Sequence, residues 1–194
     1  MSGFGGFAGL GFHHITDPAA LDHLLFLVAL VASYRWADWR HLLGVATAFT
    51  VGHSITLALV VTDLVRLPTP LIEFLIPVTI VGACLANLWR PGARPSGWAR
   101  PALAAGFGLI HGAGFANFLR EMFEGPAAGP LLAFNLGIET GQLAILALAL
   151  ALLSAFDRLL DLRSSSRGFV PRAIATSVLA GVWAATMASE RLPW

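Results

Sequence analysis

Residues 131–155 read LLAFNLGIETGQLAILALALALLSA, an almost unbroken apolar run in which Glu139 is the one charged side chain. A helix over this run is long enough to cross a bilayer, because a hydrocarbon core of about 30 Å needs roughly 20 helical residues. The rest of the chain has the same character, since 57% of its 194 residues are hydrophobic and 12% are charged. Soluble domains carry about twice that share of charge. We therefore expect an integral membrane protein that has the lipid bilayer as its main partner.

Six segments of the chain are long and apolar enough to span a membrane. They run approximately over residues 18–34, 41–62, 71–90, 101–120, 131–155 and 170–190. The pattern predicts an all-α fold: a polytopic helix bundle with about six transmembrane helices, forming a single domain over residues 1–194. The Gly/Phe-rich N-terminus has no basic segment and no convincing cleavage site, so we expect it to belong to the mature protein. It would lie in the interface or re-enter the membrane.

The arginines predict how the bundle is oriented. Six spans place both termini on one side of the membrane, together with the segments near residues 63–70 and 120–130. Three arginines fall on that side, namely Arg66, Arg120 and Arg191. Nine fall on the opposite side, namely Arg35, Arg40, Arg90, Arg94, Arg100, Arg158, Arg163, Arg167 and Arg172. The positive-inside rule then makes the nine-arginine side cytoplasmic and both termini extracytoplasmic.

Composition argues against two kinds of interaction. The net charge is +1 and the chain contains no lysine, so a nucleic acid is not expected as a partner. The one cysteine, Cys84, lies inside an apolar run, and no disulfide framework is possible.

Acidic residues and histidines converge on one half of the predicted bundle. His53 and His111 each lie about nine residues before the extracytoplasmic end of their span, which is roughly 13 Å deep. Glu139 lies at a similar depth in its span, and Asp22 and His23 lie about one turn into the first. His13, His14 and Glu73 also belong to this side. We therefore expect a polar site in the outer half of the bilayer.

Local spacing supports this site. Asn135, Glu139 and Gln142 stand at i, i+4 and i+7 and share one helix face. Thr50 and His53 share another, with Ser54 next to them. Around His111, glycines at positions 106, 108, 112 and 114 allow neighbouring helices to approach closely.

Ionisable groups in hydrocarbon cost several kcal/mol unless they are paired, which makes Asp22, His53, His111 and Glu139 candidates for function. Imidazoles with carboxylates at a matching depth suit a divalent transition metal such as nickel, cobalt or zinc, whereas calcium prefers oxygen ligands alone. A structural hydrogen-bond network is the alternative, and the role of His13 and His14 stays open.

Four stretches also carry a family resemblance: HITDPAALDHLLFLVAL, AFTVGHSITLAL, FGLIHGAGFA and FNLGIETGQLAIL, in this order over residues 14–147. They resemble the signature blocks of the HupE/UreJ membrane proteins, which are associated with hydrogenase and urease accessory functions and described as nickel or cobalt permeases. The resemblance implies a fold of about six helices in a bacterial inner membrane and a nickel-type substrate. The signature positions carried over are His14, Asp22, His23, His53, Ser54, His111, Glu139 and Gln142.

The first block departs from the family pattern. The family has a histidine, a short glycine-containing gap and then Asp-His, whereas here Asp17-Pro18-Ala19-Ala20 fills the gap. This departure leaves open both the role of His14 and the start of the first span.

Two functions fit such a site. A permease would bind Ni²⁺ or Co²⁺ from outside through His53, His111, Asp22 and Glu139, and the family resemblance favours it. An intramembrane zinc-dependent hydrolase would hold the metal with His23, His53 and His111 and would act on a lipid or membrane peptide. Glu139 or Asp22 would then be the general base, with Ser54 or Gln142 supporting an oxyanion. A metal sensor or structural module is a third and weaker reading.

Overall fold

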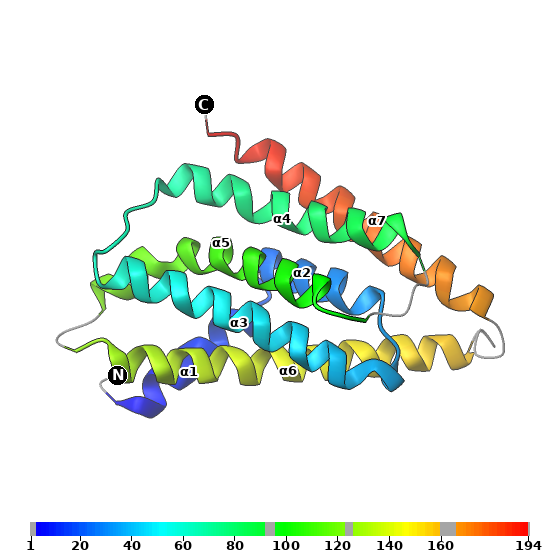
Figure 1. The fold of residues 1–194 in the computed structure, drawn as a ribbon, viewed down its shortest axis with the longest axis horizontal. Helices are drawn as coiled ribbons and strands as arrows, with labels where there is room; N and C mark the ends of the chain where they lie inside the picture. The colour runs from blue at the N-terminus through cyan, green and yellow to red at the C-terminus, as the bar shows by residue number, and fades with distance from the viewer. Residues whose placement is uncertain (1–2, 92–95, 123–125, 160–165, 194) are drawn as a thin grey trace.

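The computed structural model describes residues 3–91, 96–122, 126–159 and 166–193, and these residues form helices and no strands. The helices are α1 (Phe4–Thr16), α2 (Leu21–Ala32), the short 3₁₀ helix η1 (Trp36–Asp38), α3 (Trp39–Val61), α4 (Thr69–Trp89), α5 (Ala99–Glu121), α6 (Ala128–Leu159) and α7 (Ser166–Glu190). The long helices lie side by side in an elongated bundle (Figure 1). Five are long and apolar enough to cross a membrane, and α1 with α2 can form a broken sixth span. The predicted all-α membrane bundle is therefore confirmed.

The first predicted span differs from the structure. In place of one helix over residues 18–34 there are two short helices, α1 and α2, bent by 70° at the residues between them. With 12 residues, α2 is only about 18 Å long and is too short to cross alone. The N-terminal Gly/Phe-rich stretch is helix α1, and it packs along α6.

The bend follows from Asp17-Pro18. A residue before proline is disfavoured in helical conformation, and Asp17 accordingly has an extended backbone with ψ 121°. The Asp17 carboxylate accepts a hydrogen bond of 2.9 Å from the Ala19 amide, which fixes the turn. The four residues that depart from the family's first block are thus the break between two half-helices.

Glycines bring two pairs of helices into backbone contact. In the first pair, Gly108 and Gly112 of α5 lie against the carbonyl oxygens of Phe49 and His53 in α3. In the second pair, Gly11 of α1 and Gly137 of α6 each lie against a carbonyl oxygen of the other helix. A side chain at any of these positions would overlap the partner backbone, so the predicted close approach beside His111 is confirmed for Gly108 and Gly112.

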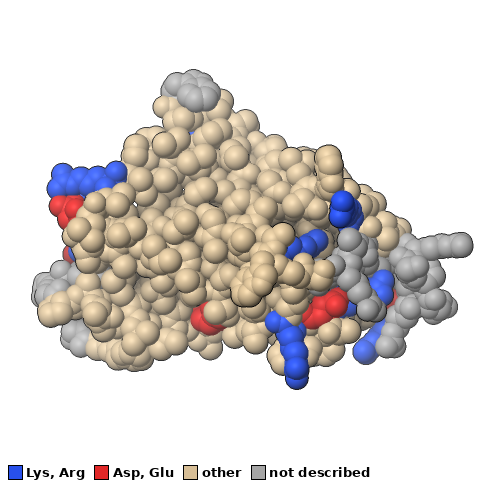
Figure 2. Space-filling view, in the orientation of Figure 1, with Lys and Arg blue, Asp and Glu red and all other residues tan. Residues whose placement is uncertain are grey.

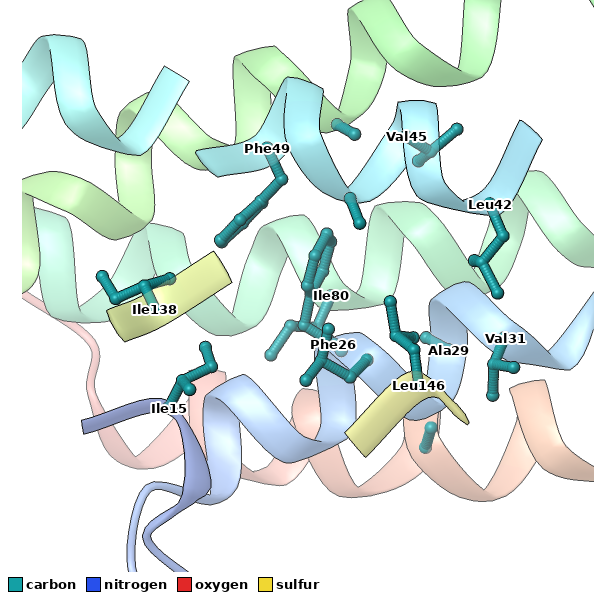
Figure 3. Close-up of a cluster of buried hydrophobic side chains, with 14 of the residues drawn as sticks. Ile15, Phe26, Ala29, Val31, Leu42, Val45, Phe49, Ile80, Ile138 and Leu146 are labelled. Carbon is teal, nitrogen blue, oxygen red and sulfur yellow. The ribbon is translucent and has the colours of Figure 1, made fainter. Parts of the chain in front are cut away.

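The hydrophobic core fills the space where the half-helices meet the long helices. Figure 3 shows Ile15 from α1, Phe26 from α2 and Phe49 from α3 converging there with Ile80 of α4 and Ile138 of α6. These side chains are at most 2% exposed. The core therefore holds the α1–α2 break in place between α3, α4 and α6.

Charged surface gathers at the two ends of the bundle (Figure 2). At one end Asp63 pairs with Arg66 at 2.7 Å and with Arg120 at 3.2 Å. The hydrogen bond from Arg66 is the main cause that holds the pKa of Asp63 below its usual range. The opposite end carries most of the described arginines, while Arg94 and Arg163 lie outside the described residues. This arrangement is that of an integral membrane protein in contact with the lipid bilayer.

Candidate metal centre

Three imidazoles meet at the break between the half-helices. His14 lies in the last turn of α1, His23 in the first turn of α2 and His53 beyond the middle of α3. One ring nitrogen from each of the three lies within 4.8 Å of the other two. We call these residues the histidine triad. The bend at Asp17-Pro18 is what brings His14 back towards His23, since their ring centroids are 4.6 Å apart.

Each ring of the triad has at least one nitrogen without a hydrogen-bond partner among the described residues. Nε2 of His14, Nε2 of His23 and both ring nitrogens of His53 are buried and unpartnered. Buried polar atoms in proteins are nearly always paired, because leaving one unpaired costs about 1–3 kcal/mol. A cation among the three rings would bind one buried nitrogen from each of them.

Asp22 orients one member of the triad. Its Oδ1 lies 3.0 Å from Nδ1 of His23 and accepts a second hydrogen bond of 2.9 Å from the His23 amide. Its Oδ2 lies 3.6 Å from the guanidinium of Arg191, which follows the last helix. With Nδ1 held in this way, His23 is left with Nε2 for an ion, which is the usual relation between a carboxylate and a metal-binding histidine.

His111 lies next to the triad but has a different partner. Its ring centroid is 5.7 Å from that of His23, and its side chain is 1% exposed. Its Nε2 lies 3.0 Å from the Thr79 hydroxyl of α4, and its Nδ1 is buried without a partner. His111 therefore forms the edge of the cluster and keeps one nitrogen available.

Glu139 does not join the group of three. Its Oε1 accepts a hydrogen bond of 2.6 Å from the Thr47 hydroxyl of α3, on the side where α6 meets that helix. Its neighbours on the same α6 face also contact α3. Gln142 accepts a 3.1 Å hydrogen bond from Thr50, and Asn135 lies beside His53. The predicted shared face of Asn135, Glu139 and Gln142 is therefore present, and it is turned towards α3.

Ser54, next to His53 in α3, bonds within its own helix. Its hydroxyl donates a hydrogen bond of 2.7 Å to the carbonyl of Thr50.

Phenylalanines surround the cluster. Phe115 lies 4.0 Å from His14 between ring centroids, and Phe49 and Phe26 lie 5.2 and 5.4 Å from His111. Phe26 and Phe49 also stack on each other at 4.5 Å. The histidines thus stand in an apolar cage, where the electrostatic pull of their nitrogens on a cation is weakly screened.

Comparison with known proteins identifies a family for the chain. A family model described as HupE / UreJ protein matches residues 1–188. The chain belongs to the HupE/UreJ family. The match includes α1 and nearly all of α7, and so extends beyond the four sequence blocks that first indicated it. The searches of curated proteins and of solved structures gave no significant match.

Two residues of the site in this HupE/UreJ protein escaped the sequence reasoning. Thr79 is the hydroxyl residue in the interior of α4, and Arg191 directly follows α7. The sequence does show Thr79 as a polar residue in the middle of a span. Which helix its side chain faces depends on packing, which the sequence does not show. Nothing in the sequence relates Arg191 to Asp22.

Proposed function

We propose that this HupE/UreJ protein is a permease for a divalent transition metal, nickel or cobalt, and that the ion binds at the histidine triad. The observation that carries the proposal is the meeting of three imidazoles at the break between α1 and α2, each with a buried ring nitrogen that has no hydrogen-bond partner among the described residues. The family is known for nickel and cobalt transport, which supports the same substrate class.

The chemistry of the triad suits these ions. Imidazole nitrogens are good ligands for nickel, cobalt, copper and zinc, and poor ones for magnesium or calcium. Imidazole binds a metal in its neutral form, and the nearest carboxylate, that of Asp22, lies behind His23. A site with this modest charge is able to release its ion, which a transport cycle requires. His111, with its free Nδ1, completes the cluster.

The broken helix also supports transport. Discontinuous helices place unpaired backbone groups and helix ends inside the membrane, and secondary transporters commonly bind their substrates there. In this protein the histidines flank such a break, with His14 before it and His23 after it. A break of this kind gives the chain a natural point of flexure beside the ion.

The hydrolase alternative receives less support from the same contacts. A catalytic zinc needs a free carboxylate or hydroxyl near its water to act as base. Asp22 is engaged by His23 and Arg191, Glu139 lies outside the triad with one oxygen bonded to Thr47, and Ser54 is bonded to the backbone of its own helix. Zinc hydrolysis therefore remains the second candidate, with the same triad as its metal site.

We propose the orientation that the arginines favour, with the arginine-rich end in the cytoplasm of a bacterium and both termini outside the inner membrane. His53 then lies in the extracytoplasmic half of α3, and His111 lies near the middle of α5. The ion would reach the triad from outside and leave towards the arginine-rich end.

The test is uptake of radiolabelled nickel and cobalt into proteoliposomes. We expect the wild-type protein to accumulate the ion and the His53→Ala variant to lose both uptake and metal binding. The matched control is His13→Ala, because His13 is an exposed residue next to the triad member His14. This control should keep both properties.

Uptake that survives in His53→Ala would contradict the proposed site. Metal retained by the purified wild-type protein without any uptake would contradict the permease and favour the hydrolase.

A further inference from the structure

Glu139 is an acidic residue inside the membrane-spanning part of α6 that the metal site leaves unused. It is half-buried and lies where α6 meets α3. One carboxylate oxygen, Oε1, accepts the hydrogen bond from Thr47, while Oε2 is buried with no partner among the described residues. An unpaired carboxylate oxygen at this depth is costly, and such residues in transporters often exchange protons.

Beyond the bond to Thr47, Glu139 lies near an apolar groove between α3 and α6. The groove has a volume of about 410 Å³ and is lined among others by Leu43 of α3 and by Leu143 and Leu146 of α6. Leu43 lies one turn before Thr47, and Leu143 lies one turn after Glu139. Lipid and leucine side chains therefore provide no cation to neutralise the carboxylate.

No charged group compensates Glu139 from the elements that pack on α6, which are α1, α2, η1 and α3. The ionisable residues of these four elements are His13, His14, Asp22, His23, Asp38, Arg40, His41 and His53. Within the described part of the chain, none of them has a hydrogen bond or ion pair with Glu139. A carboxylate at Glu139 therefore has no counter-ion among these residues.

We propose that Glu139 is the proton-exchanging carboxyl of the transport cycle, and that metal movement is coupled to the binding and release of its proton. The step is a proton transfer in which a hydronium ion gives its proton to Oε2, leaving water and a neutral carboxylic acid. The reverse transfer restores the carboxylate. Thr47 donates to Oε1 in both states, so the side chain keeps its position.

The polar residues between α3 and α6 connect this carboxyl to the metal site. Thr47 bonds Glu139, and Thr50 of the next turn bonds Gln142 of α6. One turn further along α3 stands His53 of the triad. A change of charge at Glu139 therefore acts on the same contact between α3 and α6 that holds His53 in place. This inference rests on the proposed permease function.

Labelling with dicyclohexylcarbodiimide tests the proton site without any metal. This apolar reagent reacts with protonated carboxyls: the carboxyl oxygen bonds to its central carbon, the acid proton moves to nitrogen, and rearrangement leaves a stable N-acylurea. We expect labelling at Glu139 that decreases as the pH is raised and is lost in Glu139→Gln. The matched control is Glu73→Gln, since Glu73 is exposed near the start of α4. Absence of label on Glu139 at both acidic and alkaline pH would overturn the inference.

Uptake driven by an imposed pH gradient tests the coupling. Glu139→Gln should bind nickel as the wild type does, because it lies outside the triad, but its uptake should lose the response to the gradient. Glu73→Gln should respond like the wild type. A wild-type response in Glu139→Gln would overturn the coupling and leave the permease intact. Failure of the wild-type protein to take up metal under any gradient would instead overturn the permease, and this result does not depend on residue 139.

Discussion

Asp22 divides its two carboxylate oxygens between the ring of His23 and the guanidinium of Arg191. A carboxylate behind a histidine ligand fixes the tautomer of the ring and raises its basicity, and such partners are typically worth 10–100-fold in metal affinity. Arg191 reduces this benefit, because its charge competes for the same carboxylate. If the triad binds a metal as proposed, Asp22 would tune its affinity while remaining outside it.

We predict that Asp22→Asn weakens nickel binding by about 10–100-fold without abolishing it, because the imidazoles remain and only their support is changed. Isothermal titration of the purified protein measures this. Unchanged affinity would show that Asp22 has no such role. Complete loss of binding in a folded variant would make Asp22 a direct ligand, as the sequence alone suggested.

At the scale of single residues, the sequence identified the ionisable side chains inside the membrane as candidates, but it could not assign their partners. His14, His23 and His53 were all candidates, and the structure places them together. Glu139 was equally prominent in sequence, yet its bonds are to Thr47. The difference lies in the rotation of each helix about its axis, which packing decides and which residue type does not reveal.

The helices form backbone-contact pairs because glycine occupies the points of closest approach. In the pair of α3 with α5, the position of Gly108 faces a carbonyl oxygen, whereas Gly106 has no atom of another helix nearby. Two glycines of one helix thus have opposite packing requirements, although they are only two residues apart.

We predict that Gly108→Ala destabilises the protein by about 1–3 kcal/mol, because the new methyl group forces α3 and α5 apart. The same change at Gly106 should be neutral or stabilise the helix by about 0.5–1 kcal/mol, since alanine is the better helix former. Thermal unfolding of the two variants in the same detergent makes the comparison. Equal unfolding temperatures would contradict the assignment of Gly108 to the contact.

The long helices were predictable because an apolar run of bilayer length has few alternatives. Five spans agree with the prediction apart from their ends, such as the extension of α6 to Leu159. The first span was predicted as one helix because composition does not show a bend. Pro18 was the visible signal, but the sequence alone does not distinguish a proline at the start of a helix from a proline in a break between two helices.

The distribution of arginine along the molecule sets its predicted orientation. One end carries Arg66 and Arg120 around Asp63, and the other carries Arg35, Arg40, Arg90, Arg100, Arg158 and Arg172. At the arginine-rich end Arg172 also bonds Asp157 at 2.7 Å and the carbonyl of Tyr34 at 3.0 Å. Burial there raises the pKa of Tyr34 to about 12. This end is therefore cross-linked by polar contacts as well as charged.

We predict that Ser96→Cys is reached by a membrane-impermeant thiol reagent only from the cytoplasm, and Gly129→Cys only from outside. Both positions are exposed, and they lie at opposite ends of the bundle. A Cys84→Ala background removes the native thiol. Labelling of intact cells and of inverted vesicles distinguishes the two sides. The reverse pattern would overturn the orientation and with it the direction of transport.

The glycine contacts have a mechanical consequence for the ion. His53 and His111 belong to the α3–α5 pair, whereas His14 belongs to the α1–α6 pair, and within each pair the backbones are too close to slide independently. We therefore expect any relative motion to occur between the pairs, and the rings of His14 and His53 face each other across that boundary. A bound ion would link the α3–α5 pair to the α1–α6 pair across that boundary. Releasing the ion and separating the two pairs would then be one and the same event.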